Sequence, residues 1–133
     1  MSASAILQPD GWPRPSGYSN GVLMQGRQVF IAGQVGWNPV SGKFESASLV
    51  DQVAQALRNV LAVLAQADGR PEHIARMTWY LTSRAEYIAR LKEIGAAYRD
   101  IMGKHFPAMT AVEVSALVEA QAKVEIEATA VIP

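Results

Sequence analysis

The sequence predicts an α+β domain in which a single mixed β-sheet carries two helices on one face. Residues 106–130 contain two runs in which apolar and polar side chains alternate, as they do in half-buried strands. Residues 48–69 and 83–103 each carry an apolar stripe of helical period, and a third alternating run lies between them at residues 73–82. Successive strand, helix and strand units form right-handed crossovers, which place both helices on the same face of the sheet.

Composition is consistent with one domain spanning residues 1–133, because a chain of this length buries about two thirds of its unfolded surface. Twelve basic and twelve acidic residues give a formal net charge of zero, which makes nucleic acid and anionic membranes unlikely partners. The absence of cysteine excludes disulfides and a thiolate nucleophile. No stretch is apolar enough for a signal peptide or a membrane span, so we expect a cytoplasmic protein.

The N-terminal segment, residues 1–21, is expected to form a loop or arm. Its second half, PDGWPRPSGYSNG, is rich in proline, glycine, serine and asparagine, which favour turns. Trp12 and Tyr18 are large apolar groups that a flexible tail would leave exposed to water, so we expect the segment to pack against another surface. The next segment has two short apolar runs, residues 22–24 and 29–32, separated by QGR, which predicts a hairpin.

Two capping boxes, in which a serine is followed three residues later by an acidic residue, mark the predicted starts of the helices. One consists of Ser48 and Asp51, and the other of Ser83 and Glu86. The first helix is expected to end near Gly69, and its apolar stripe comprises Val53, Leu57, Val60, Leu61 and Leu64. The second is expected to run to Gly103, and its stripe comprises Tyr87, Leu91, Ile94, Tyr98 and Ile101.

Alternation in the two C-terminal strands separates a core face from an acidic face. The second strand has an apolar face that consists of Val124, Ile126, Ala128 and Ala130, opposite Glu125 and Glu127. In the first strand Met109, Ala111 and Glu113 share one face, and we assign that face to the acidic side. Because both helices cover the other side, we expect oligomerisation to cover the acidic face.

The sequence PAMTAVEV, followed by KVEIEATA, resembles the C-terminal signature of the RidA (YjgF) family, whose usual form is PARS or PART, then VEV and a closing VEIEA. FIAGQVGWNP and DQVAQALRNVLAVL resemble that family's SGQxPxxP segment and first helix, so the resemblance covers nearly the whole chain in order. It implies a RidA/chorismate-mutase-like fold and a homotrimer, in which the sheets form a central barrel with the helices outside. It also implies small-molecule sites in the clefts between subunits.

The resemblance also implies roles for individual residues. Glu125 matches the glutamate that positions or activates the water that hydrolyses an imine, which makes it the candidate catalytic residue. Tyr18 matches a tyrosine that hydrogen-bonds the ligand, and Gly33 matches a glycine that lets the ligand approach the backbone. The alternatives are a solvated glutamate, a tyrosine that only anchors the arm, and an ordinary glycine at a strand end.

Three further substrate-binding positions depart from the family pattern. Ala32 stands where the family has serine, Gly95 where it has asparagine, and Met109 where it has the arginine that holds a substrate carboxylate in a bidentate fork. Gly95 lies beside an apparent four-residue extension of the helix. Methionine is flexible and apolar, so it suits an aliphatic or aromatic ligand group, unless it only fills a gap between subunits.

The remaining candidates are aromatic and histidine side chains. Trp37, Trp79 and Tyr80 are candidates to line a pocket, although aromatic residues on strands more often belong to the core. Trp79 and Tyr80 are neighbours on one strand, so they point to opposite faces. His73 and His105 lack a second ligand at metal spacing, and no cofactor motif is found, so we expect neither metal nor cofactor.

Three functional hypotheses follow. The first is a hydrolytic enamine/imine deaminase acting on a small reactive metabolite, whose substrate lacks the usual carboxylate or binds it otherwise. The second is a non-catalytic small-molecule binding protein on the same trimeric scaffold, because three ligand-contact positions differ. The third is an RNA-acting or chaperone-like protein, which the scattered basic residues disfavour.

Overall fold

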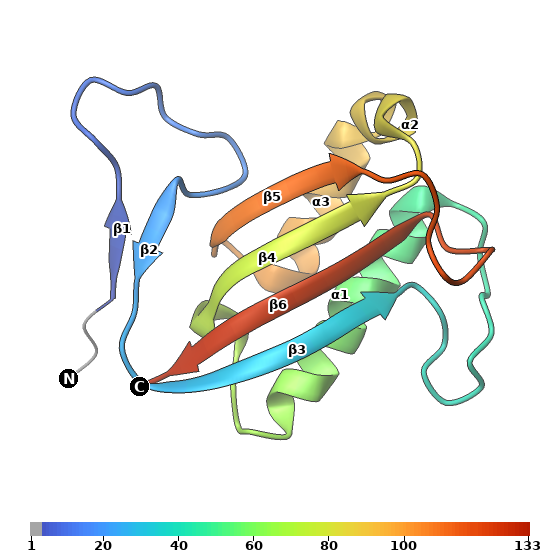
Figure 1. Cartoon of the computed structure of the whole chain (residues 1–133), viewed down its shortest axis with the longest axis horizontal. Coiled ribbons are helices and arrows are strands. Elements are labelled where there is room, and N and C mark those ends of the chain that lie inside the picture. The colour runs from blue at the N-terminus through green and yellow to red at the C-terminus, as the bar shows by residue number, and fades with distance from the viewer. Residues whose placement is uncertain (1–3) are drawn as a thin grey trace.

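The computed structural model describes residues 4–133 and has a four-stranded mixed sheet with its helices on one face (Figure 1). The α+β class and the single mixed sheet with two main helices are therefore confirmed. The sheet order is β3 (Arg27–Val35), β6 (Val124–Ile132), β4 (Ile74–Leu81) and β5 (Ala108–Glu113). Helices α1 (Leu49–Ala65) and α3 (Leu91–Met102) lie behind this sheet in the view of Figure 1.

The order of the strands follows from two crossover connections. Strand β5 runs parallel to β4 and is reached through α2 (Arg84–Ala89) and α3, while β6 runs antiparallel between β3 and β4. The two C-terminal runs are thus strands, as predicted, but β4 separates them in the sheet. Strand β5 is consequently an edge strand.

The core lies between α1, α3 and the sheet. The Ser48 hydroxyl accepts a hydrogen bond from the Asp51 N–H at 3.4 Å, which confirms the cap of α1. Four of the five predicted stripe residues of α1 are fully buried, and only Leu61 is partly exposed. They pack against the buried face of β6, whose members Val124, Ile126, Ala128 and Ala130 are the predicted core residues.

The second predicted helix is divided. Arg90, at φ −109° and ψ 14°, leaves the helical region between α2 and α3, so one continuous helix over residues 83–103 is wrong. Most of the predicted stripe nevertheless faces the core: Ile94 and Tyr98 are buried, and only Leu91, the first residue of α3, is largely exposed at 49%. The Ser83 cap is present, with the Ser83 hydroxyl accepting from the Glu86 N–H at 3.1 Å.

The predicted hairpin is also wrong. Strand β2 (Gly21–Leu23) pairs with β1 (Ala5–Leu7) in a separate ribbon, whereas β3 pairs with β6. A short isolated hairpin is only marginally stable, and the nine-residue strand β6 offers β3 a much longer ladder of hydrogen bonds. The predicted arm therefore contains a strand, and its first three residues lie outside the described range.

A serine anchors the arm to the domain. The Ser19 N–H donates to the Pro107 carbonyl at 3.0 Å, and the Ser19 hydroxyl donates to the Phe106 carbonyl at 2.6 Å. Trp12 remains 59% exposed, so the rest of the described chain does not bury it. Because the anchoring serine is next to Tyr18, it fixes Tyr18 beside the start of β5.

Candidate functional site

The two sheet faces carry different chemistry, and Met109 lies on the helix side. It is paired in register with Met77, which is buried in the core. Glu125 is paired with Tyr80 on the opposite, helix-free face. Our assignment of Met109 to the same face as Glu125 is therefore wrong. Alternation correctly grouped Met109 with Glu113, but on an edge strand with polar and apolar residues on both faces it does not show which face is inward.

An aromatic-lined cavity of about 450 Å³ opens between α3 and the edge strand β5. It brings together three of the predicted substrate-binding residues, Tyr18, Gly95 and Met109, from the arm, α3 and β5 respectively. Its walls are largely apolar and comprise Trp79, Tyr87, Leu91, Ile94, Tyr98 and Phe106. A cavity of this size and lining suits a small ligand with an apolar body.

Stacked rings fix one wall of this aromatic cavity. Tyr98 and Phe106 are stacked with their centroids 5.7 Å apart and their planes at 18°. The Tyr98 hydroxyl donates to the His105 carbonyl at 2.6 Å. Burial raises the pKa of Tyr98 well above its ordinary value, so this phenol stays neutral. Trp79 lies beside both Tyr98 and Tyr87, with ring centroids 6.3 Å apart in each pair.

The polar groups of the aromatic cavity are few. Gly95 lacks a side chain where a Cβ would lie 3.2 Å from the Arg99 Nη1, so the guanidinium lies over the glycine. Arg99 is a site residue that our sequence reasoning missed, although its i,i+4 spacing from Gly95 places the two on one helix face. The Trp79 indole N–H is buried and has no hydrogen-bond partner within residues 4–133.

The other predicted site residues lie on the helix-free face. A Cβ on Gly33 would overlap the carboxyl group of Glu125, so the glycine makes room for that side chain. Ala32 and Gly33 occupy an irregularity in the β3–β6 pairing, between Ile31 and Gln34. Ala32 lines a shallow hollow with Arg76, Thr78 and Glu127 rather than the aromatic cavity. One chain thus brings Gly33 and Glu125 together, but apart from Met109.

Tyr80, not Trp79, occupies the helix-free face. The Tyr80 hydroxyl donates to the Glu127 carboxylate at 2.6 Å, and this hydrogen bond raises the pKa of Tyr80 above its ordinary value. Glu127 is therefore engaged in holding Tyr80. Within residues 4–133 the Glu125 carboxylate has no ion pair, which leaves it available to an incoming group.

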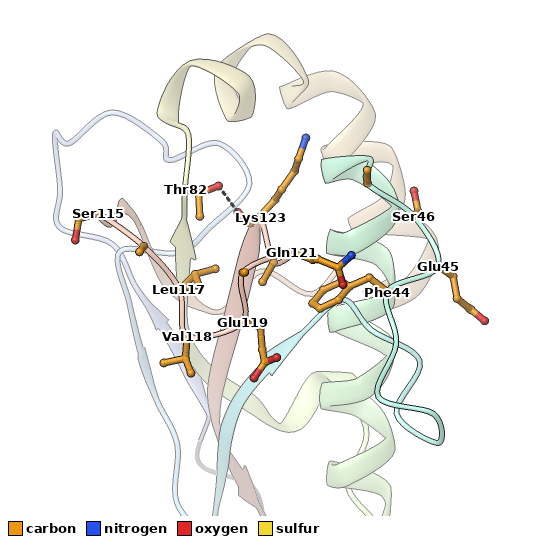
Figure 2. A pocket seen from close by; sticks show the side chains of 14 residues that line it. Phe44, Glu45, Ser46, Thr82, Ser115, Leu117, Val118, Glu119, Gln121 and Lys123 are labelled. Carbon is orange, nitrogen blue, oxygen red and sulfur yellow. Dashed lines mark hydrogen bonds between the residues drawn. The ribbon is translucent and has the colours of Figure 1, made fainter.

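A second, larger hollow of about 850 Å³ lies between the loops at residues 44–47 and 115–123 (Figure 2). Its side chains diverge: in Figure 2 those of Ser115 and Glu45 point outward at opposite ends. The Thr82 hydroxyl, 3.5 Å from the Lys123 carbonyl, makes the hydrogen bond drawn there. Trp37 packs on Phe44 at this end, with ring centroids 5.9 Å apart, and does not line the aromatic cavity. The aromatic cavity is the better candidate site.

Two further classes of site find no support in the described part of the chain. No three His, Asp or Glu side chains among residues 4–133 lie close enough together to hold a metal ion. His73 and His105 instead bond backbone groups, the N–H of Arg70 and the carbonyl of Ile74. Of the helices in residues 4–133, none has the length and apolar content needed to cross a membrane.

Known proteins similar in sequence share nearly the whole chain. A family model described as endoribonuclease L-PSP matches residues 13–132. A RutC family protein of Pyrococcus horikoshii is 34% identical over 125 residues, which cover 94% of this chain and 95% of that protein. The human 2-iminobutanoate/2-iminopropanoate deaminase is 30% identical over 114 residues, which cover 86% of this chain and 79% of that protein.

Solved structures give the same match in three dimensions. YyfB of Yersinia pestis, a protein of the conserved Rid family, superposes with a TM-score of 0.85 at 31% identity, over 97% of this chain and 98% of that one. The YjgF gene product of E. coli superposes with a TM-score of 0.70 at 30% identity, over 91% of this chain and 93% of that one.

Proposed function

The chain belongs to the endoribonuclease L-PSP family, which includes the RidA/YjgF and RutC proteins, and on this premise we propose that it is a hydrolytic deaminase of small enamines or imines. One observation carries the proposal: a cavity of small-molecule size gathers Tyr18, Gly95 and Met109 from three separate elements. Relatives named 2-iminobutanoate/2-iminopropanoate deaminase support the reaction class.

The lining of the aromatic cavity favours a substrate different from the short amino-acid-derived imines. Met109 replaces a cation on β5 with a flexible apolar side chain, and the rings of Tyr98 and Phe106 extend the apolar surface. A ligand with an aryl or branched alkyl body would bury its surface there, at about 25 cal/mol for each Å² of apolar area removed from water. The substrate class is therefore an imine with such a body.

The acid/base group of the proposal is Glu125, and it requires a second copy of the chain. In one chain Glu125 and the aromatic cavity lie on opposite sides of the sheet. The helix-free face also exposes apolar side chains, with Phe30 at 74% and Val112 at 40%. In the homotrimer that we propose, a neighbouring copy covers this face and presents its Glu125 to the cavity at the β5 edge.

The proposed reaction adds water to the carbon–nitrogen double bond. The Glu125 carboxylate takes a proton from water as the water oxygen bonds to the carbon of the protonated imine, which gives a neutral carbinolamine. The carboxylic acid then returns this proton to the nitrogen, and the carbon–nitrogen bond breaks as the carboxylate accepts the proton of the carbinolamine hydroxyl and passes it to bulk water. The products are one ketone and one ammonia for each imine and water consumed.

Ketone release from enzymatically generated imines tests the proposal. An amino acid oxidase supplies imines that carry a carboxylate, and an amine oxidase supplies imines that lack one. We expect the protein to accelerate ketone release from aryl or branched alkyl imines over the spontaneous rate. Sedimentation at micromolar concentration should give a trimer. A monomer, or no acceleration with any imine, would contradict the proposed catalysis.

A non-catalytic binding protein is the second candidate function, and one observation favours it. The described residues that line the aromatic cavity include no carboxylate, so a single chain binds without an acid/base group at hand. Ligand binding without any acceleration of imine hydrolysis would select this candidate.

A further inference from the structure

The aromatic cavity contains one charge. Of the described residues that line it, Arg99 alone is ionised at neutral pH, and the others are apolar or carry hydroxyl groups. Arg99 projects from α3, the wall that faces Met109 on β5. A lone cation at an apolar cavity attracts a ligand that combines an anionic group with an apolar body.

The position of this guanidinium depends on Gly95. Gly95 lies one helical turn before Arg99 and has no side chain, which leaves space for the guanidinium. A Cβ at this position would approach the Arg99 Nη1 to 3.2 Å. No carboxylate within residues 4–133 forms an ion pair with Arg99. The exposed side chain of Arg99 therefore lies at the cavity without an internal ion-pair partner in the described part of the chain. Its planar fork of N–H donors matches the two oxygens of a carboxylate.

We propose that Arg99 is the anion clamp of the aromatic cavity, and that the ligand is a small carboxylate with an aryl or branched alkyl body. The inference rests on the proposed function only in taking this cavity as the ligand site. The cation that binds the carboxylate then lies on α3, across the cavity from Met109 on β5. The ligand body then lies along the stacked rings of Tyr98 and Phe106, and its carboxylate lies over Gly95.

Three probe compounds measure the contributions of the carboxylate and of the apolar body to binding. Phenylpyruvate carries both the ring and the carboxylate, phenylacetone carries the ring alone, and pyruvate carries the carboxylate alone. Calorimetric titration of the full chain should show phenylpyruvate binding more tightly than either of the others. The charge-assisted hydrogen bond should make the preference over phenylacetone about 10- to 100-fold, and burial of the phenyl ring should give the preference over pyruvate.

The variant Arg99→Gln should weaken phenylpyruvate binding by about 10- to 100-fold and leave phenylacetone binding within about twofold. Arg58→Gln is the matched control, because Arg58 is an exposed arginine on α1 that does not line the aromatic cavity. It should bind all three probes as the wild type does. Arg99→Lys keeps the charge but loses the fork, so it should recover part of the affinity for phenylpyruvate.

Several outcomes would overturn the inference: equal wild-type affinity for phenylpyruvate and phenylacetone, unchanged phenylpyruvate binding in Arg99→Gln, or an equal loss in Arg58→Gln. Absence of binding by all three probes would overturn it as well. These are binding results with stable compounds, so they are independent of turnover. Imine hydrolysis together with a failed clamp would leave the proposed function standing, and a working clamp without hydrolysis would favour the binding protein.

Discussion

The two faces of the sheet divide the features that a deaminase needs. The helix side holds the aromatic cavity with one cation, Arg99, and the open side holds Glu125 with Gly33 beneath it. The proposed ligand cavity and the proposed acid/base residue thus lie on opposite faces of the same β-sheet. In the proposed function, one chain therefore supplies the ligand cavity and a second copy is needed to complete the reaction.

Backbone geometry explains why the two functions are separated. Successive residues of a strand point to opposite faces, so Trp79 enters the aromatic cavity while its neighbour Tyr80 faces outward to Glu127. A site that uses both faces must be closed by another molecule, and the exposed Phe30 and Val112 mark where a second copy would pack. Variants that affect one face and not the other test this division.

The largest expected effect is on the open face. Glu125→Gln keeps the shape of the side chain but removes its acid/base function, so turnover of an imine should fall by about 100-fold or more. Phenylpyruvate affinity and sedimentation should stay as in the wild type. Glu127→Gln is the matched control, since Glu127 bonds Tyr80 and is assigned no acid/base role, and its effect on turnover should be mild.

Full turnover in Glu125→Gln would remove the open face from the mechanism. A loss of turnover accompanied by loss of the trimer would instead mark Glu125 as an assembly residue. Initial rates of ketone release, measured beside sedimentation on the same preparations, distinguish these outcomes.

An arginine on the opposite wall of the aromatic cavity should restore the phenylpyruvate affinity that Arg99→Gln removes. Met109→Arg, made in the Arg99→Gln background, returns a guanidinium to the same cavity from β5 instead of α3. A charge-assisted hydrogen bond contributes about 1.5–3 kcal/mol, so phenylpyruvate affinity should recover by about 10- to 100-fold. Phenylacetone is the control ligand. Recovery for both ligands alike would show a general gain in contact rather than a restored charge.

Much of the fold could be predicted from periodicity, because period-two and period-3.6 patterns report directly which side chains are buried. The cap at Ser48 and the buried face of β6 were predictable in this way. The pairing of β2 was not, because short apolar runs fit several partners and only tertiary packing selects one. Nor was the break at Arg90, because no proline or glycine marks it.

The candidate site was less predictable for a related reason. The motif around Met109 and the one around Glu125 are close in sequence, but β4 lies between their strands in the sheet. The register pairs Met109 with Met77 on the helix side and Glu125 with Tyr80 on the open side. Arg99 lies in no motif and draws notice only through its position over Gly95. Residues that act through spatial proximity leave little trace in a linear pattern.

Two tyrosine variants compare how much one side-chain hydrogen bond on each face contributes to the free energy of unfolding. Tyr98→Phe removes the hydrogen bond to the His105 carbonyl from the buried wall of the aromatic cavity, and should cost about 1 kcal/mol of the free energy of unfolding. Tyr80→Phe removes a bond of the same length to the Glu127 carboxylate on the open face. Where water reaches that face the loss should be smaller than that of Tyr98→Phe, and where a second copy covers it, as in the proposed homotrimer, the loss should be at least as large. Chemical denaturation at neutral pH measures both.

The contribution of Tyr98 to stability should also depend on pH. Burial raises the folded-state pKa of Tyr98 above the ordinary tyrosine value of 10.0, so the fold favours the neutral phenol. Its contribution to stability is fully present below pH 10.0 and is lost as the pH rises towards the raised folded-state pKa. Tyr98→Phe should therefore flatten the alkaline decline in melting temperature. An unchanged decline would contradict the role of Tyr98.

The smallest expected effect concerns Gly95, which leaves space for the side chain of Arg99. Gly95→Ala lies inside α3, where alanine favours the helix over glycine by about 0.8–1 kcal/mol, so the variant should be more stable by up to about that amount. The new Cβ would meet the Arg99 Nη1 at 3.2 Å, and the flexible end of the arginine would shift away to relieve the contact. Phenylpyruvate affinity should then fall a few-fold while phenylacetone affinity stays constant, because the charge moves and the apolar walls do not. A more stable variant with undiminished phenylpyruvate affinity would show that binding of the carboxylate does not depend on a guanidinium placed over Gly95.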